Sequence, residues 1–126
     1  MPRSQHEDDL LTEARKVLPG GGFGNLSFDI VIREGKAARV WDESGNEYVD
    51  FLLGSGPMFL GHAHPDVTAA AVAQMAKGTT FFANNAEGIK LARVIVDAVA
   101  CAEQVRFVSS GTEADAYAMQ IGRAHV

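Results

Sequence analysis

Cysteine, positive charge and long apolar runs are all scarce in this chain of 126 residues. Cys101 is the single cysteine, so no disulfide can form within the chain, which is consistent with a reducing compartment. The net charge of −5, without a basic stripe, argues against a nucleic-acid partner. No stretch approaches the roughly 18 apolar residues of a membrane span, and the acidic N-terminus lacks a signal-peptide core. We therefore expect a cytoplasmic protein, without membrane contact, that acts on a small molecule.

The first half of the chain predicts a helix followed by a small antiparallel sheet. Apolar residues recur at helical spacing over residues 4–18, behind an acidic first turn. Residues 28–33 are rich in β-branched side chains and indicate a strand. Residues 37–42 and 47–51 flank a turn that contains glycine, which is typical of a hairpin. We expect Trp41 and Phe51 to anchor the core of this hairpin.

The second half predicts helices around one strand of the buried type. Pro65 begins a helix that ends at Gly78, and residues 86–100 form another with one apolar face. Residues 104–108 indicate a buried strand, and a last helix opens at Thr112. Because a parallel-type strand needs neighbours on both sides, we expect this α/β chain to be the opening portion of a larger protein.

The passage from that strand into the last helix suits an anion. Ser110, Gly111 and Thr112 place backbone N–H groups, hydroxyls and the positive end of a helix around one point, as a phosphate site requires. The alternative is an ordinary helix cap, with Thr112 accepting from helix N–H groups and Glu113 favoured in the first turn. A P-loop is disfavoured because no lysine follows Gly111.

Three motifs in order carry a family resemblance. The first is Trp41-Asp42 with Gly-Asn-Glu-Tyr-Val-Asp-Phe at residues 45–51. The second is Leu-Gly-His-Ala-His-Pro at 60–65, and the third is Phe-Val-Ser-Ser-Gly-Thr-Glu-Ala at 107–114. Together they resemble the N-terminal part of class III pyridoxal-phosphate-dependent aminotransferases, over about residues 34–120. The branch that includes glutamate-1-semialdehyde aminomutase is the most similar.

The resemblance implies a fold-type I homodimer that uses pyridoxal 5'-phosphate to move an amino group between small amino and oxo substrates. Carried over by position, Ser110, Gly111 and Thr112 bind the cofactor phosphate, while Ser55 and Gly56 lie near the substrate. The lysine that forms a Schiff base with the cofactor lies, in the family, beyond Val126. No catalytic residue is therefore assigned within this chain, which we expect to be inactive alone. The lysines present match no catalytic position and are expected to be solvated: Lys16, Lys36, Lys77 and Lys90.

Two departures from the aminomutase pattern affect the implied substrate. Ser55 precedes Gly56-Pro57 where that branch has tryptophan. Residues 24–28 replace an Asn-Ser-Pro-Val-Arg stretch, so no arginine stands there to hold a substrate carboxylate. We therefore favour a related transaminase over aminomutase activity, which stays an alternative. A non-catalytic dimerisation or decoy module is a further alternative, and exposed apolar surface on the last two helices would argue against it.

The implied domain organisation has three parts. Residues 1–60 form the N-terminal helix and hairpin, and residues 61–120 begin the large mixed-sheet domain that binds the cofactor. Residues 121–126 match one reading frame of a widely used sequencing adapter, and we hypothesise that they are a non-native tail.

Other candidate residues are better explained without a catalytic or ligand-binding role. His62 and His64 could chelate a metal, but Asp66 is the one further ligand nearby, so no metal site is predicted. Phe81 and Phe82 are expected to pack rather than to line a substrate mouth. Cys101 is expected to be a small buried hydrophobe.

Overall fold

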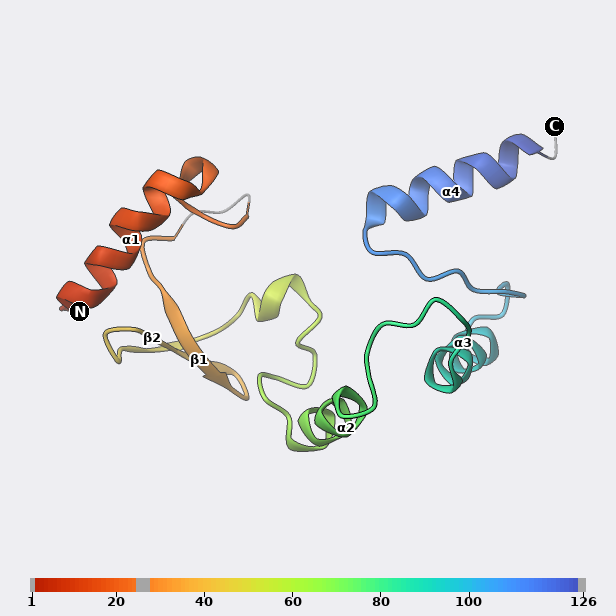
Figure 1. The fold of residues 1–126 in the computed structure, drawn as a ribbon, viewed down its shortest axis with the longest axis horizontal. Helices are drawn as coiled ribbons and strands as arrows, with labels where there is room; N and C mark the ends of the chain where they lie inside the picture. Colours follow the sequence, from red (N-terminus) through yellow and green to blue (C-terminus); the bar gives the residue numbers. More distant parts are fainter. Residues whose placement is uncertain (1, 25–27, 125–126) are drawn as a thin grey trace. The chain divides into compact units, whose positions relative to one another are not determined.

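The computed structural model describes residues 2–24 and 28–124, which form two compact units, Met1–Gly78 and Thr79–Val126. The first unit holds α1 (Gln5–Val17), η1 (Pro19–Gly21), β1 (Ile32–Lys36), β2 (Arg39–Asp42), β3 (Glu47–Val49), η2 (Leu53–Ser55) and α2 (Pro65–Met75). The second unit holds α3 (Ala86–Ala98) and α4 (Gly111–Ala124) (Figure 1). No helix of these described residues is both long enough and apolar enough to span a lipid bilayer.

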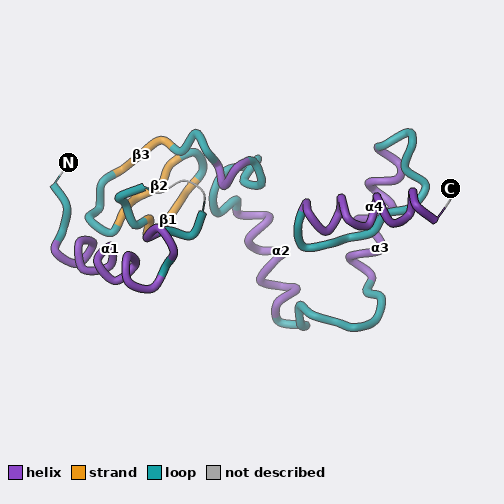
Figure 2. Tube along the Cα trace, turned by 90° about the horizontal axis from the view of Figure 1, so that it is seen from above, coloured by secondary structure: helices purple, strands orange, loops and turns teal. Residues whose placement is uncertain are grey.

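The strands of the first unit form an antiparallel sheet in the order β1-β2-β3 (Figure 2). The predicted hairpin is confirmed as β2 and β3, which are joined by a turn where Gly45 has φ 83°. The strand predicted at residues 28–33 is misplaced, since β1 begins only at Ile32. Just before β1, backbone groups form hydrogen bonds with side chains instead of with a neighbouring strand. The carbonyl of Asp29 accepts from Arg3, and the N–H of Val31 donates to Glu7.

The predicted first helix is confirmed as α1, and its ends follow from local chemistry. The Ser4 hydroxyl accepts the N–H of Glu7 at 3.2 Å, which caps the first turn. Acidic residues in the first turn and basic residues in the last turn complement the helix dipole. Pro19 begins η1 directly after the C-cap Leu18, so α1 cannot continue.

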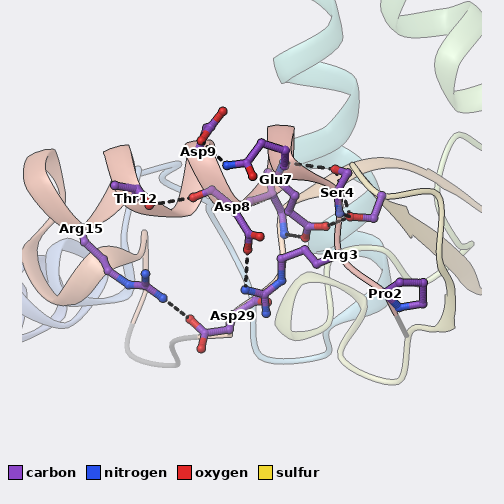
Figure 3. A network of polar contacts seen from close by, with 12 residues as sticks. Pro2, Arg3, Ser4, Glu7, Asp8, Asp9, Thr12, Arg15 and Asp29 are labelled. Atoms are coloured by element: carbon purple, nitrogen blue, oxygen red, sulfur yellow. Dashed lines mark hydrogen bonds and ion pairs between the residues drawn. The ribbon is translucent and has the colours of Figure 1, made fainter.

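Polar contacts attach α1 to the rest of the first unit, one set through the buried Glu7 and one through the exposed Arg15. The Glu7 side chain accepts the Val31 N–H at 2.8 Å and the Ser44 hydroxyl, although its residue is only 1% exposed. Arg15 donates to the Asp29 carboxylate at 3.0 Å, and Figure 3 shows this contact beside those of Glu7. A buried carboxylate is tolerated because its oxygens are hydrogen-bonded.

A second buried carboxylate, Asp42, organises the hairpin. It is 1% exposed and accepts from the Asn46 backbone at 2.7 Å, the Asn46 amide at 2.9 Å and the Tyr48 hydroxyl at 2.8 Å. Burial alone would raise the pKa of Asp42, but the hydrogen bonds from Asn46 and Tyr48 favour the charged form and hold this pKa below its usual value. The hydrogen bond that the Tyr48 hydroxyl donates to Asp42 raises the pKa of Tyr48.

The described part of the second unit is helical. The predicted helix over residues 86–100 is confirmed as α3, with Asn85 accepting the Gly88 N–H at 2.9 Å as its cap. The predicted strand at residues 104–108 is wrong. A strand requires a hydrogen-bonded neighbour, and the described part of this unit contains no other strand. Phe107 and Val108 are consequently exposed.

Five single-residue expectations for packing have mixed outcomes. Trp41 is half-buried, but Phe51 is 92% exposed and does not anchor the hairpin. Phe81 and Phe82 are both exposed rather than packed, and Cys101 is exposed rather than buried. The predicted non-native tail falls partly in α4, and its residues 125–126 lie outside the described residues. Residues 25–27, within the 24–28 stretch that departs from the aminomutase pattern, also lie outside them.

Candidate functional site

The beginning of α4 is capped by Ser110. The helix starts at Gly111, and the Ser110 hydroxyl accepts the N–H of Glu113 at 3.3 Å. The capping role predicted for Thr112 is therefore wrong, because Thr112 already lies inside the first turn. Ser110, Gly111 and Thr112 thus occupy the cap and the first two helical positions, where helix N–H groups lack intrahelical acceptors.

A carboxylate already sits on part of this donor set. Glu113 Oε2 accepts the Ser109 N–H at 3.0 Å and the Ser110 hydroxyl at 3.0 Å. Sequence reasoning noted Glu113 only as favourable in a first turn and did not foresee its return to Ser109. The capping-box spacing, a serine three residues before a glutamate, was the available signal. The contact demonstrates that donors from Ser109 and Ser110 converge on an anionic group.

The remaining donors of the turn are open to solvent. No hydrogen bond within the described residues uses the N–H groups of Gly111 and Thr112 or the Thr112 hydroxyl. A Cβ placed on Gly111 would meet no atom within 4 Å, so a ligand could approach its backbone freely. Two unpaired N–H groups and a hydroxyl at a helix N-terminus fit a phosphate group.

The other predicted residues, Ser55 and Gly56, belong to the first unit. They lie at the end of a turn in which four consecutive residues are left-handed, with φ of 46° at Leu53, 65° at Gly54, 65° at Ser55 and 111° at Gly56. This conformation is strained at Leu53 and Ser55, which carry side chains. Strained backbone of this kind gathers at ligand-binding sites.

Asp50 supports that turn, and sequence reasoning missed it. Asp50 Oδ1 accepts the N–H groups of Leu52 at 2.8 Å and Leu53 at 3.0 Å. Asp50 Oδ2 lies 2.7 Å from His62 Nε2. The hydrogen bond with His62, followed by those from the backbone, holds the pKa of Asp50 below its usual value. An aspartate just before a glycine-containing loop was the available signal, since such residues often bond backbone groups two residues on.

The two histidines of the second motif have different surroundings. His62 is engaged with Asp50, while His64 precedes α2 and caps it without a side-chain bond. Across residues 2–24 and 28–124, no three side chains of His, Cys, Asp or Glu are placed to hold a metal ion.

The four lysines are exposed, as expected. Lys16 pairs with Glu13 at 3.0 Å and Lys90 with Glu87 at 2.8 Å, both along helix surfaces. Such exposed pairs contribute little to stability.

Comparisons with known proteins show the family to which this chain belongs. The family model described as aminotransferase class-III matches residues 22–126. A glutamate-1-semialdehyde 2,1-aminomutase from Chloroflexus aurantiacus is 42% identical over 88% of this chain, which covers 27% of that relative. The chain therefore spans less than a third of the length of this relative.

Solved structures show the same relationship. An omega-transaminase from Sphaerobacter thermophilus is similar in structure, with a TM-score of 0.87 and 35% identity. The match covers 98% of this chain and 29% of the length of that enzyme. A transaminase with bound pyridoxal phosphate matches 98% of this chain and 30% of its own, with a TM-score of 0.88 and 34% identity. The helix, small antiparallel sheet and following helices are thus similar to the N-terminal part of such enzymes. With the family model covering residues 22–126, this chain belongs to the class III aminotransferase family.

Proposed function

We propose that this chain serves amino-group transfer dependent on pyridoxal 5'-phosphate, and that Ser110, Gly111 and Thr112 bind the cofactor phosphate. The supporting observation is the donor set at the start of α4, where Ser109 and Ser110 already bind a carboxylate and the next two N–H groups are open. When bound, the cofactor supplies an electron sink for the bonds around the substrate amino carbon.

The chain's own residues would orient that cofactor. The N–H groups of Gly111 and Thr112 and the Thr112 hydroxyl donate to phosphate oxygens, and the N-terminal end of α4 favours their negative charge. The Ser110 hydroxyl joins them by leaving Glu113. Ser55 and Gly56 line the approach of a small amino or oxo substrate, and the protein acts as a homodimer. In this proposal residues 1–60 form the N-terminal segment and 61–120 begin the large mixed-sheet domain.

Two activities compete within this proposal. The aminomutase relative, at 42% identity, favours isomerisation of glutamate 1-semialdehyde. Ser55 favours transamination, because a small hydroxyl stands where the aminomutase branch has tryptophan and changes the shape of the substrate approach. We give priority to transamination, which the transaminase structures at 34% and 35% identity also support.

The test uses the protein at its full natural length, saturated with pyridoxal phosphate. Amino transfer from 1-phenylethylamine to pyruvate is measured as acetophenone absorbance, and glutamate 1-semialdehyde is supplied in a parallel assay. We expect transfer from the amine and slower conversion of the semialdehyde. Faster conversion of the semialdehyde would favour the aminomutase, while cofactor binding without either reaction would contradict both and leave the non-catalytic module.

A further inference from the structure

The turn from Leu53 to Gly56 holds a conformation that its sequence does not favour. Leu53 and Ser55 have φ of 46° and 65°, in the left-handed region where a side chain crowds the backbone. Both alternate with glycines that adopt this region freely. Strained residues persist only when their surroundings fix them, so neighbouring contacts must hold this turn.

The turn has backbone hydrogen bonds of its own, since the Ser55 N–H donates to the Leu52 carbonyl and those of Gly56 and Met58 donate to the Leu53 carbonyl. The side chain that ties it to the rest of the unit is one carboxylate. Asp50 Oδ1 accepts from Leu52 and Leu53, the two N–H groups that lead into the turn. Asp50 Oδ2 meets His62 Nε2 at 2.7 Å, and both side chains are mostly shielded from solvent. A partly desolvated, charge-assisted bond is stronger than a surface ion pair, so this carboxylate is firmly held.

His62 is in turn fastened to the sheet. Its N–H donates to the Ala37 carbonyl at 2.8 Å, and its carbonyl accepts the Ala37 N–H at 2.9 Å. Its ring lies so close to β1 that a Cβ on Gly35 would be 2.6 Å from its Cγ. A Cβ on Gly61 would be 2.8 Å from the Ala37 backbone. His62 therefore has little freedom to move away from Asp50.

We propose that Asp50 and His62 form a clasp that holds the Leu53–Gly56 turn against the sheet and thereby positions Ser55 for the substrate. The clasp is the pair of side chains Asp50 and His62 with the N–H groups of Leu52 and Leu53. Both are positioning residues, because they act on a ligand only through the turn. The substrate part of this inference rests on the proposed function, whereas the holding of the turn does not.

The experiment measures the turn and the chemistry separately in the full-length protein loaded with pyridoxal phosphate. Asp50→Ala and His62→Ala break the clasp. Asp50→Asn keeps an acceptor for the two N–H groups, and His62→Gln keeps a donor near the position of Nε2. Asp29→Asn is the matched control, since Asp29 is an exposed carboxylate of the same unit that pairs with Arg15. Amide exchange in β2 reports whether each variant still folds.

We expect the alanine variants to speed amide exchange at Leu52 and Leu53 by about tenfold to a hundredfold, the range that loss of a hydrogen bond to a charged group gives. Their kcat/KM for 1-phenylethylamine falls by a similar factor because Ser55 is displaced, while affinity for pyridoxal phosphate is unchanged. The Asn and Gln variants recover most of both losses. The Asp29→Asn control behaves as wild type.

Three results decide against parts of this proposal. Unchanged exchange at Leu52 and Leu53 in folded alanine variants overturns the clasp. Faster exchange with unchanged kcat/KM overturns its role in positioning. A wild-type protein that transfers no amino group contradicts the proposed function, and the exchange rates alone then decide whether the clasp holds the turn. If an alanine variant does not fold, His62→Leu, which fills the space against Gly35 but offers Asp50 no hydrogen bond, carries the exchange test, and wild-type exchange at Leu52 and Leu53 in it overturns the clasp.

Discussion

The contacts that stabilise the two units of this chain are of different kinds. The first unit closes through contacts between residues far apart in sequence, and four of its described residues are buried: Glu7, Leu11, Val40 and Asp42. In the described part of the second unit no side chain is buried, and α3 and α4 do not pack against each other. The second unit is therefore held by local contacts such as its helix caps.

The first unit buries few apolar side chains among its described residues. Only two of its buried residues are apolar, and the other two are carboxylates whose hydrogen bonds join α1, the hairpin and the segment before β1. Large apolar side chains are exposed in both units, such as Phe51 and Phe59 in the first and Ile89, Val94 and Met119 in the second. This exposure argues against an independent decoy module.

The largest expected effect is a difference in amide exchange between the units. We expect amides of β2 to exchange at least about a hundredfold more slowly than those of residues 105–108, because only the former are in a hydrogen-bonded sheet. Exchange followed by mass spectrometry on the 126-residue chain measures this ratio. Equal protection in the two segments would remove the contrast between the units.

Removal of Glu7 should weaken the first unit most among single substitutions. Glu7→Ala leaves the Val31 N–H and the Ser44 hydroxyl without their acceptor, and we expect a loss of about 3 kcal/mol in the free energy of unfolding. Glu13→Ala, an exposed change in the same helix, should alter it by less than about 0.5 kcal/mol. Urea unfolding followed by Trp41 fluorescence gives both values, and equal values would show that the buried network is not stabilising.

Two glycines with the same backbone angle separate crowding from strain. Gly61 and Gly45 both have φ of 83°, but a Cβ on Gly61 would meet the Ala37 backbone at 2.8 Å, whereas one on Gly45 meets nothing within 4 Å. We expect Gly61→Ala to cost about 2 kcal/mol more than Gly45→Ala in the same urea experiment. Equal costs would mean that the loop before α2 is not packed closely against Ala37.

Loss of the α4 cap should act only on the second unit. Ser110→Ala removes the acceptor of the Glu113 N–H, at a cost of about 1 kcal/mol in helix stability. Thr112→Ala should not lower helix content, because Thr112 caps nothing in the described structure. Circular dichroism measures helix content in both variants, and an equal loss in both would restore Thr112 as the cap.

Acid should weaken the first unit through Asp42 and Asp50. Folding lowers the pKa of both carboxyls, so their contribution to stability is complete above the ordinary value of 3.8. It is lost as the pH falls through the lower folded values, because protonation breaks the bonds from Asn46, Tyr48 and His62. Urea midpoints recorded between neutral and acidic pH measure this loss. Asp42→Asn should reduce the pH dependence, and an unaltered profile would contradict the assignment.

Local chemistry made much of the fold predictable. Helical periodicity located α1 and α3, Pro65 marked the start of α2, and the Gly45 turn located the hairpin. The absence of a strand at residues 104–108 was not predictable in this way, because an apolar run forms a strand only when a partner pairs with it. The exposure of Phe51 and Cys101 depends likewise on what packs against them.

The candidate site was predictable where it is local. Ser110, Gly111 and Thr112 are consecutive, so their convergence on one helix end follows from the sequence. The contacts of Asp50 with His62 and of Glu7 with Ser44 join residues 12 and 37 positions apart. Single polar residues at such separations leave no periodic pattern, so only the folded chain reveals them.

Binding of pyridoxal phosphate to threonine variants tests the central claim most directly. The full-length protein is titrated with the cofactor, and its fluorescence quenching gives Kd for wild type, Thr112→Val and the control Thr80→Val, an exposed threonine of the same unit. We predict that Thr112→Val raises Kd by about tenfold or more, as loss of a hydrogen bond to a charged group does, and that Thr80→Val leaves it unchanged. Equal Kd values for Thr112→Val and wild type would contradict a phosphate site at the start of α4.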